Sequence, residues 1–184
     1  MKQSWQMWQS QINPEHCDQM IEEFRKLPPI GAQTFNNEGQ LGENPHRQSK
    51  VRWVDDQDLR NMLWWYAREA NRLAFGLDVT DAGSIQFTEY SSEYNGRYDW
   101  HHDVDWTSDV AFDRKISVVL QLSDGNYYEG CDFQFDEVQN PDPEALRAKG
   151  TIICFPSYLR HRVTEITKGS RYSLVAWFEG PRWR

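Results

Sequence analysis

Two histidines and one aspartate give this 184-residue sequence its clearest capacity for metal chemistry. His101 and Asp103 are two positions apart, and His161 follows far downstream. In an extended strand, side chains at positions i and i+2 point the same way, so His101 and Asp103 can converge on one ion while His102 points to the opposite face. Two imidazoles and one carboxylate form the ligand set that holds non-haem Fe(II) and leaves other positions open. The spacing therefore predicts an iron site whose third ligand comes from a neighbouring strand.

Arg171, in the segment that follows His161, makes this pattern more specific. A His-x-Asp match alone is weak in a chain with five histidines, and a lone histidine such as His101 is more often structural. A guanidinium pairs bidentately with a carboxylate, so a buried Arg171 would suit a site that binds a dicarboxylate. The alternative for Arg171 is an ordinary surface salt bridge.

From about residue 85 to residue 177 the chain resembles the 2-oxoglutarate and Fe(II)-dependent oxygenases of the prolyl 4-hydroxylase-like superfamily. The order and spacing of the matching segments carry the resemblance, and these segments are Ile85-Gln-Phe-Thr-Glu-Tyr90, Tyr98-Asp-Trp-His101-His-Asp103, Arg114-Lys-Ile-Ser-Val-Val-Leu-Gln-Leu-Ser123, Tyr128-Glu-Gly-Cys-Asp-Phe133, Gly150-Thr-Ile-Ile-Cys-Phe-Pro156, His161-Arg-Val163 and Gly169-Ser-Arg171-Tyr-Ser-Leu174. The sequence departs from the family at Gly130-Cys131, where relatives usually carry Gly-Gly, and we expect this to alter only a turn. A slightly longer stretch between Tyr90 and His101 leaves open which tyrosine faces the co-substrate.

The resemblance implies a role for five residues. His101, Asp103 and His161 would bind Fe(II), and Arg171 would hold the C5 carboxylate of 2-oxoglutarate, with Tyr90 as its hydroxyl partner. Ascorbate is a further candidate cofactor. The implied reaction is a hydroxylation coupled to the conversion of 2-oxoglutarate into succinate and CO2, and the resemblance assigns no catalytic residue beyond the metal and co-substrate ligands.

The protein-modifying members of the family predict a protein or peptide substrate, with prolyl 4-hydroxylation as the first expectation. Lysyl hydroxylation and the hydroxylation of a small molecule are alternatives, because the ligand set does not select among them. Two other classes stay open. One is a non-catalytic jelly-roll binding module, against which the complete ligand set argues, and the other is a cupin-like hydrolase or isomerase that takes Zn(II).

Composition sets the broad class of the protein. The length suits a single domain over residues 1–184 with a proper core. The sequence has no apolar run of about 18 residues and no apolar segment typical of a signal peptide at its start, so no membrane partner is expected. Three widely spaced cysteines indicate reduced thiols and a cytoplasmic location. A net charge of −8 disfavours nucleic acid and suits a cationic or neutral peptide, while the oligomeric state stays open.

Residues 1–80 are predicted to form a helical support with a lid loop. Asn13 and Pro14 begin one helix, and a second is predicted over residues 56–75 with Leu59, Leu63 and Leu73 on its apolar face. The polar residues 34–50 are expected to form a long loop. It is either a solvated connector or a mobile lid over the site.

Residues 85–178 are predicted to form the core of a mainly β fold with N-terminal helices (α+β). Their short strands, separated by turn residues, favour a sandwich or barrel, and the family adds a double-stranded β-helix, a jelly-roll and cupin-like architecture. Residues 104–113 should form a second loop that could also act as a lid. Trp106 in this loop is expected either to touch the substrate or to plug the core.

Overall fold

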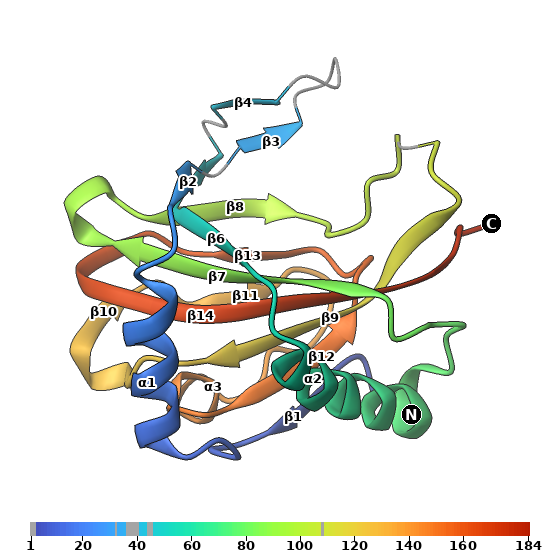
Figure 1. Ribbon diagram of the computed structural model, residues 1–184, viewed down its shortest axis with the longest axis horizontal. Helices are drawn as coiled ribbons and strands as arrows, with labels where there is room; N and C mark the ends of the chain where they lie inside the picture. Colours follow the sequence, from blue (N-terminus) through green and yellow to red (C-terminus); the bar gives the residue numbers. More distant parts are fainter. Residues whose placement is uncertain (1–2, 32, 36–40, 44–45, 108) are drawn as a thin grey trace.

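The computed structural model describes every residue except 1–2, 32, 36–40, 44–45 and 108. Strands dominate the chain after residue 80, and the two longer α-helices lie before residue 71 (Figure 1). The strands and α-helices in chain order are β1 (Gln6–Trp8), α1 (Pro14–Phe24), β2 (Ile30–Gly31), β3 (Gln33–Phe35), β4 (Leu41–Glu43), β5 (Arg47–Gln48), β6 (Lys50–Val54), α2 (Gln57–Ala70), β7 (Gly83–Ser91), β8 (Arg97–His101), β9 (Phe112–Gln121), β10 (Tyr128–Gly130), β11 (Phe133–Phe135), α3 (Pro143–Arg147), β12 (Ile152–Pro156), β13 (His161–Val163) and β14 (Ile166–Pro181).

Two antiparallel sheets form the double-stranded β-helix, which confirms the predicted fold class. The larger sheet has the order β1-β12-β9-β14-β7-β6-β2, with β10 also paired to β14. The smaller sheet has the order β11-β13-β8-β5 and carries two of the three predicted metal ligands. Strands β1, β2 and β6 belong to the larger sheet, so the first 80 residues supply strands as well as the predicted helices.

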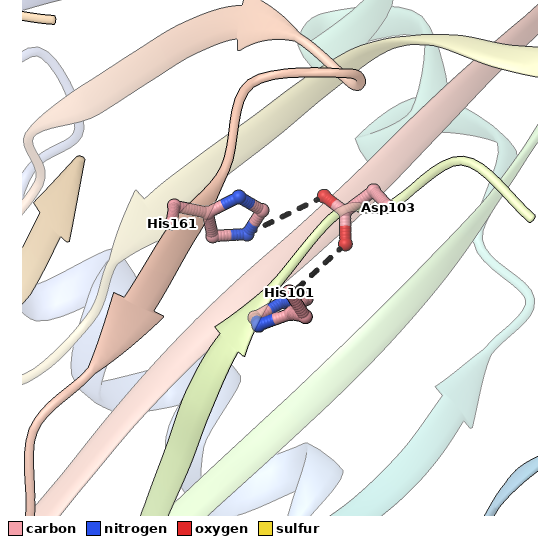
Figure 2. A group of neighbouring side chains, drawn as sticks. All are labelled: His101, Asp103 and His161. Atoms are coloured by element: carbon pink, nitrogen blue, oxygen red, sulfur yellow. Dashed lines mark ion pairs between the residues drawn. The ribbon is translucent and has the colours of Figure 1, made fainter. Parts of the chain in front are cut away.

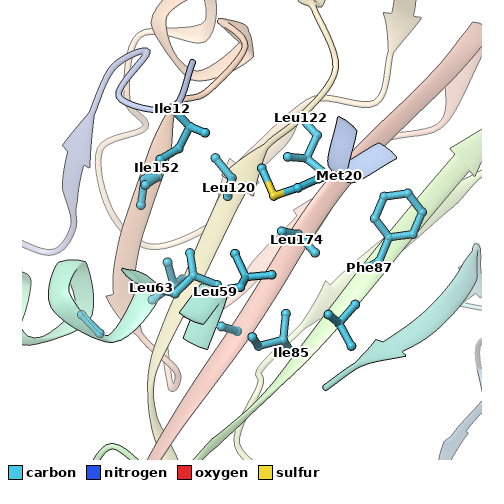
Figure 3. Close-up of a cluster of buried hydrophobic side chains, with 14 of the residues drawn as sticks. Ile12, Met20, Leu59, Leu63, Ile85, Phe87, Leu120, Leu122, Ile152 and Leu174 are labelled. Carbon is cyan, nitrogen blue, oxygen red and sulfur yellow. The ribbon is translucent and has the colours of Figure 1, made fainter. Parts of the chain in front are cut away.

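Helices α1 and α2 pack against one face of the larger sheet (Figures 1 and 3). Asn13 caps α1 by accepting a hydrogen bond from the Glu15 amide at 2.8 Å, and Asp56 caps α2 through the Leu59 amide at 2.9 Å. Each fully buried aliphatic or aromatic side chain in this layer stabilises the fold by roughly 1.5–3 kcal/mol. The layer includes Cys17, Met20, Phe24, Leu59, Leu63, Phe87, Leu120, Cys154 and Leu174. None of the helices within the described residues is of a length and hydropathy that could cross a bilayer.

The prediction of one long loop over residues 34–50 is wrong for the residues that the structure describes. This segment contains most of β3, all of β4 and β5, and the first residue of β6. Strands β3 and β4 pair only with each other, in a hairpin that extends beyond the two sheets (Figure 1). Backbone pairing of this kind needs no alternating apolar side chains, which explains why the polar sequence gave no indication of it. Residues 36–40 and 44–45 of the predicted lid lie outside the described residues.

The predicted helix over residues 56–75 changes its geometry near its end. Regular α-helix stops at Ala70, and a π-helical turn (Asn71–Phe75) follows, closed by a hydrogen bond from the Gly76 amide to the Asn71 carbonyl at 2.9 Å. This wider turn rotates the side chains that follow it. Leu73 is therefore 56% exposed and not part of the apolar face, which corrects the prediction.

The second predicted loop, residues 104–113, is shorter than expected. Phe112 and Asp113 already belong to β9, where they pair with the end of β14. Trp106 is 56% exposed, so it does not plug the core. The loop directly after the metal motif thus presents an exposed aromatic side chain, while the strand that follows it begins earlier than the sequence indicated.

Candidate metal and co-substrate site

The structure brings His101, Asp103 and His161 together, and their side chains point toward one another (Figure 2). His101 ends β8 and His161 begins β13, and the two are direct register partners. The chain after β8 is held by a hydrogen bond from the Asp103 amide to the Ser157 carbonyl at 3.0 Å. One nitrogen of each histidine and a carboxylate oxygen lie within 4.8 Å of one another. The small sheet therefore fixes both imidazoles, and the loop before β13 fixes the carboxylate.

Backbone carbonyls orient both imidazole rings. The Nδ1 atom of His101 lies 2.7 Å from the Asp99 carbonyl, and that of His161 lies 2.9 Å from the Leu159 carbonyl. A carbonyl only accepts, so Nδ1 carries the proton in each ring and Nε2 keeps a free lone pair. Both Nε2 atoms face Asp103, at 3.6 Å from its two oxygens. The donor set therefore has the tautomers that a divalent metal requires.

Asp103 is prepared to act as an anionic ligand. The Ser117 hydroxyl donates to its Oδ2 at 2.6 Å, and Ser157 lies 2.9 Å from the same hydroxyl. Burial opposes the charge of Asp103, but the attraction of His161, His101 and Arg114 and the Ser117 hydrogen bond outweigh it and lower the pKa of the carboxyl to about 2. The carboxylate is thus ionised at neutral pH and held in one orientation.

His101 is neutral at neutral pH, while its neighbour His102 lies outside the cluster. Burial, with help from the nearby His161, lowers the pKa of His101 to about 3. The exposed His102 instead places its Nδ1 atom 2.7 Å from the Tyr158 carbonyl. Two imidazoles and one carboxylate match the donor preference of Fe(II), so the residues present fit the predicted metal. That they bind it stays a prediction.

A cavity of about 850 Å³ opens beside these three residues. Its floor is the face of the larger sheet that turns away from α1 and α2, and its opposite wall carries His101 and His161. Along β14, alternate residues line the cavity, as the two-residue period of a strand requires. These are Arg171, Ser173, Val175 and Trp177. The cavity is therefore large enough for a small co-substrate together with part of a second molecule.

Arg171 is buried in the cavity wall, so the alternative of a surface salt bridge is wrong. It lies opposite Tyr90 in the β14–β7 pair, and both residues line the cavity. The Arg171 Nε atom donates to Gln121 Oε1 at 2.9 Å, and the Cys131 thiol also interacts with the guanidinium. A guanidinium held in this way is suited to a bidentate carboxylate.

Several residues around this site were not identified from the sequence. Gln121 and Ser117 lie on β9 and orient Arg171 and Asp103 through single hydrogen bonds. Cys131, which stands where relatives usually carry glycine, is buried beside Arg171. This departure therefore affects the surroundings of Arg171 and not only a turn. Burial raises the pKa of its thiol to about 11, against the influence of Arg171. Only the strand parity of Ser117 and Gln121 could have indicated that they face the site.

Comparisons with known proteins agree with this architecture. A PKHD-type hydroxylase of Synechococcus sp. (strain CC9311) is 35% identical over 94 residues, which cover 51% of this chain and 41% of that protein. The match thus spans less than two thirds of the relative's length. A Pseudomonas putida prolyl-4-hydroxylase has a TM-score of 0.69 at 20% identity, covering 98% of this chain and 94% of the other. A Trichoplax adhaerens prolyl hydroxylase, in complex with a peptide fragment of the hypoxia inducible factor oxygen degradation domain, has a TM-score of 0.70 at 14% identity, covering 95% and 83%.

The family model of the 2OG-Fe(II) oxygenase superfamily matches residues 85–179. This range is more than half of the chain and runs from within β7 to Glu179, near the end of β14, so it contains the three clustered residues and Arg171. Shared fold, ordered segments and donor set lead to the same conclusion: the chain belongs to the 2OG-Fe(II) oxygenase superfamily.

Proposed function

We propose that this chain is an Fe(II)- and 2-oxoglutarate-dependent dioxygenase that hydroxylates a residue of a protein or peptide. The observation that carries the proposal is the placement of His101, Asp103 and His161 in the same cavity as the buried Arg171. A metal donor set and a carboxylate receptor in one enclosure are the two requirements for a metal and a keto diacid to be bound together.

Each residue has a defined task in this proposal. His101, Asp103 and His161 would hold Fe(II), and Arg171, with Tyr90 beside it, would bind the distal carboxylate of 2-oxoglutarate. When bound, this pair supplies the oxygen activation that ends in hydroxylation, succinate and CO2. The protein itself contributes the orientation of the ligands through Asp99, Leu159 and Ser117 and the exclusion of water from the buried Arg171 end.

The first expectation for the target is prolyl 4-hydroxylation. It is supported by the fold of two prolyl hydroxylases, one of them solved with a peptide fragment, and by relatives named PKHD-type hydroxylases. Hydroxylation of lysine or of a small molecule is the alternative. Ascorbate would act as an accessory cofactor, and the free, buried Cys17, Cys131 and Cys154 suit a reducing compartment such as the cytoplasm.

We take residues 1–184 as one catalytic unit. The strands β1, β2 and β6 complete the sheet that forms the cavity floor, and Val51 and Trp53 of β6 line the cavity itself. A fragment restricted to residues 85–178 would lack these side chains and would expose the sheet edge at β7.

The test is a measurement of 2-oxoglutarate consumption and succinate release with Fe(II), followed by mass spectrometry of a peptide pool. We expect succinate release that requires both Fe(II) and 2-oxoglutarate, and a gain of about 16 Da, the mass of one oxygen, on the modified peptide. His161→Ala should lose both, while Arg25→Gln on the exposed end of α1 should keep them. Absence of succinate release by the metal-loaded wild type would overturn the proposal.

A further inference from the structure

The cavity has two ends that differ in their side chains. Arg171 and Trp177 lie six positions apart on the same face of β14, which corresponds to about 20 Å along an antiparallel strand. The Arg171 end holds Tyr90, and the Trp177 end holds Trp53 and Arg114. If 2-oxoglutarate occupies the Arg171 end, the Trp177 end is the place for the substrate.

Arg114 reaches the cavity because of a β-bulge. Ser117 and Ile116 pair with Trp177 and Phe178, but the next pair joins Arg114 to Glu179, so one residue of β9 is left over. The extra residue reverses the alternation of side chains and turns Arg114 toward the cavity. Its guanidinium lies 3.9 Å from the centre of the Trp177 ring.

Arg114 has acidic neighbours, Asp103 and Glu179, but its guanidinium makes no direct polar contact with the described part of the protein. No described residue forms an ion pair or a side-chain hydrogen bond with its guanidinium. Burial lowers the pKa of Arg114, against the attraction of Asp103 and Glu179. A partly buried charge without a partner is costly, so an acceptor supplied by a ligand would stabilise it.

Arg47 brings a second guanidinium into the same cavity. It lies 4.5 Å from the centre of the Tyr98 ring, and Tyr98 stacks on His101 at 3.4 Å between ring centres. Its hydrogen bonds go to the neutral side chains of Gln86 and Ser49, at 2.8 and 2.9 Å. Arg47 therefore stands one ring away from the metal ligands, and these hydrogen-bond partners carry no charge that would balance its own.

The charges of the bound cofactors would not neutralise this pair of arginines. A divalent metal together with Arg171 is balanced by Asp103 and by the two carboxylates of 2-oxoglutarate. Arg47 and Arg114 then outnumber Asp105, the remaining acidic residue among the described lining residues, so the cavity wall keeps a surplus positive charge in a chain whose net charge is −8. The charge of the cavity wall is thus opposite in sign to the charge of the whole molecule. A small anion would be attracted into the cavity, while a long polyanion would be repelled by the rest of the surface.

We infer that the substrate presents a carboxylate to Arg114 and Arg47, next to the group that is hydroxylated. This inference rests on the proposed function, since it assigns the second molecule in the same cavity. The carboxylate could belong to an aspartate or glutamate of a peptide or to the α-carboxylate of a free amino acid. Trp53 and Trp177, with ring centres 6.2 Å apart, give this end an apolar wall for the rest of the substrate.

The test uses enzyme loaded with Mn(II) and 2-oxoglutarate and three pools of end-capped random pentapeptides. The pools differ only at one position beside the centre, which is fixed as glutamate, glutamine or lysine. Retention of each pool is measured by affinity selection and mass spectrometry. Free amino acids and their amides form a separate arm, which distinguishes an α-carboxylate from a side-chain carboxylate.

We expect one acidic arm, either the glutamate pool or the free amino acids, to be retained about tenfold or more above its neutral counterpart, as one charged hydrogen bond implies. Arg114→Gln and Arg47→Gln should each remove most of this preference. Arg25→Gln is the matched control, because Arg25 also lies over an aromatic ring, that of Tyr172, but outside the cavity. Arg114→Lys, which keeps the charge, should retain part of the preference and guards against misfolding of the glutamine variant.

Succinate release with Fe(II) is measured in parallel, so that failure of the carboxylate inference can be distinguished from failure of the proposed function. Equal retention of acidic and neutral ligands in both arms, or a preference that persists in Arg114→Gln and Arg47→Gln, overturns the carboxylate inference even if succinate is released. A wild type that releases no succinate with any ligand overturns the proposed function itself.

Discussion

Arg171 and Tyr90 are direct register partners on β14 and β7, and the Arg171 guanidinium lies 5.9 Å from the centre of the Tyr90 ring. Both side chains are almost completely buried. Burial raises the pKa of Tyr90 to about 12, so its hydroxyl stays protonated and can donate a hydrogen bond. A fixed cation beside a neutral donor is an arrangement suited to binding a single carboxylate.

Arg171→Ala should weaken 2-oxoglutarate binding by about 2–5 kcal/mol, because it removes one partner of a buried charge pair. Tyr90→Phe should cost less, about 0.5–1.5 kcal/mol for one neutral hydrogen bond. Titration of the Mn(II)-loaded protein with 2-oxoglutarate measures both values. Arg25→Ala serves as the control, and an unchanged affinity in Arg171→Ala would show that the carboxylate binds elsewhere.

Ser117→Ala should lower metal affinity about 10- to 100-fold, the usual effect of removing a group that orients a metal ligand. The reason is the 2.6 Å hydrogen bond that holds Asp103 Oδ2. Metal titration followed by calorimetry gives the affinity. Ser84→Ala, at the start of β7, is a matched control that should bind metal as the wild type does. Equal affinities in the two variants would mean that Asp103 is held in place without Ser117.

His101→Ala should abolish high-affinity metal binding, while His102→Ala should leave it within about threefold of the wild type. The two histidines are adjacent, but only His101 lies in the cluster of three residues that could hold a metal ion. Metal content after dialysis against Co(II), with the visible spectrum of the bound ion, distinguishes them. Loss of the spectrum in His102→Ala would contradict the strand parity on which the assignment depends.

The metal-free protein should lose stability as the pH falls below about 6.5, where the unfolded chain protonates its histidines. The pKa of His101 is lowered to about 3 in the folded state, so the folded protein does not take up this proton in the same range. His101 changes the free energy of unfolding by at most about 1.4 kcal/mol per pH unit. Asp103 adds nothing here, because its contribution is lost only below its unfolded pKa of about 3.9.

Urea unfolding of the chelator-treated protein between about pH 7 and about pH 5 measures this slope. His101→Gln should show a shallower dependence on pH than the wild type, and the exposed His102→Gln should match the wild type. Identical slopes in all three proteins would mean that the His101 imidazole is not held in its neutral form by the fold.

The convergence of His101 and Asp103 was predictable because a strand fixes the direction of alternate side chains. The same rule fails where the geometry changes by one residue. The π-helical turn exposed Leu73, and the bulge in β9 turned Arg114 toward the cavity. Neither irregularity leaves a pattern in the residue types, because backbone hydrogen bonding and not side-chain chemistry creates both.

The charge of the cavity was also not predictable from the sequence. The net charge of −8 predicted a cationic or neutral substrate, yet three arginines line the cavity, namely Arg47, Arg114 and Arg171. They come from β5, β9 and β14, which are far apart in the sequence, so only the folded chain brings them together. A sum over the whole molecule carries no information about such a local field.

The uninterrupted course of β14 between Arg171 and Trp177 limits how this protein can change during evolution. Inserting or deleting one residue there would turn every following cavity-lining side chain to the helix-covered face of the sheet. Gene duplicates that acquire new substrates should therefore vary in the lengths of the connections between strands, while the length of this strand segment stays constant. An alignment of many related sequences, anchored on Arg171, should therefore contain no insertions or deletions between residue 171 and residue 177.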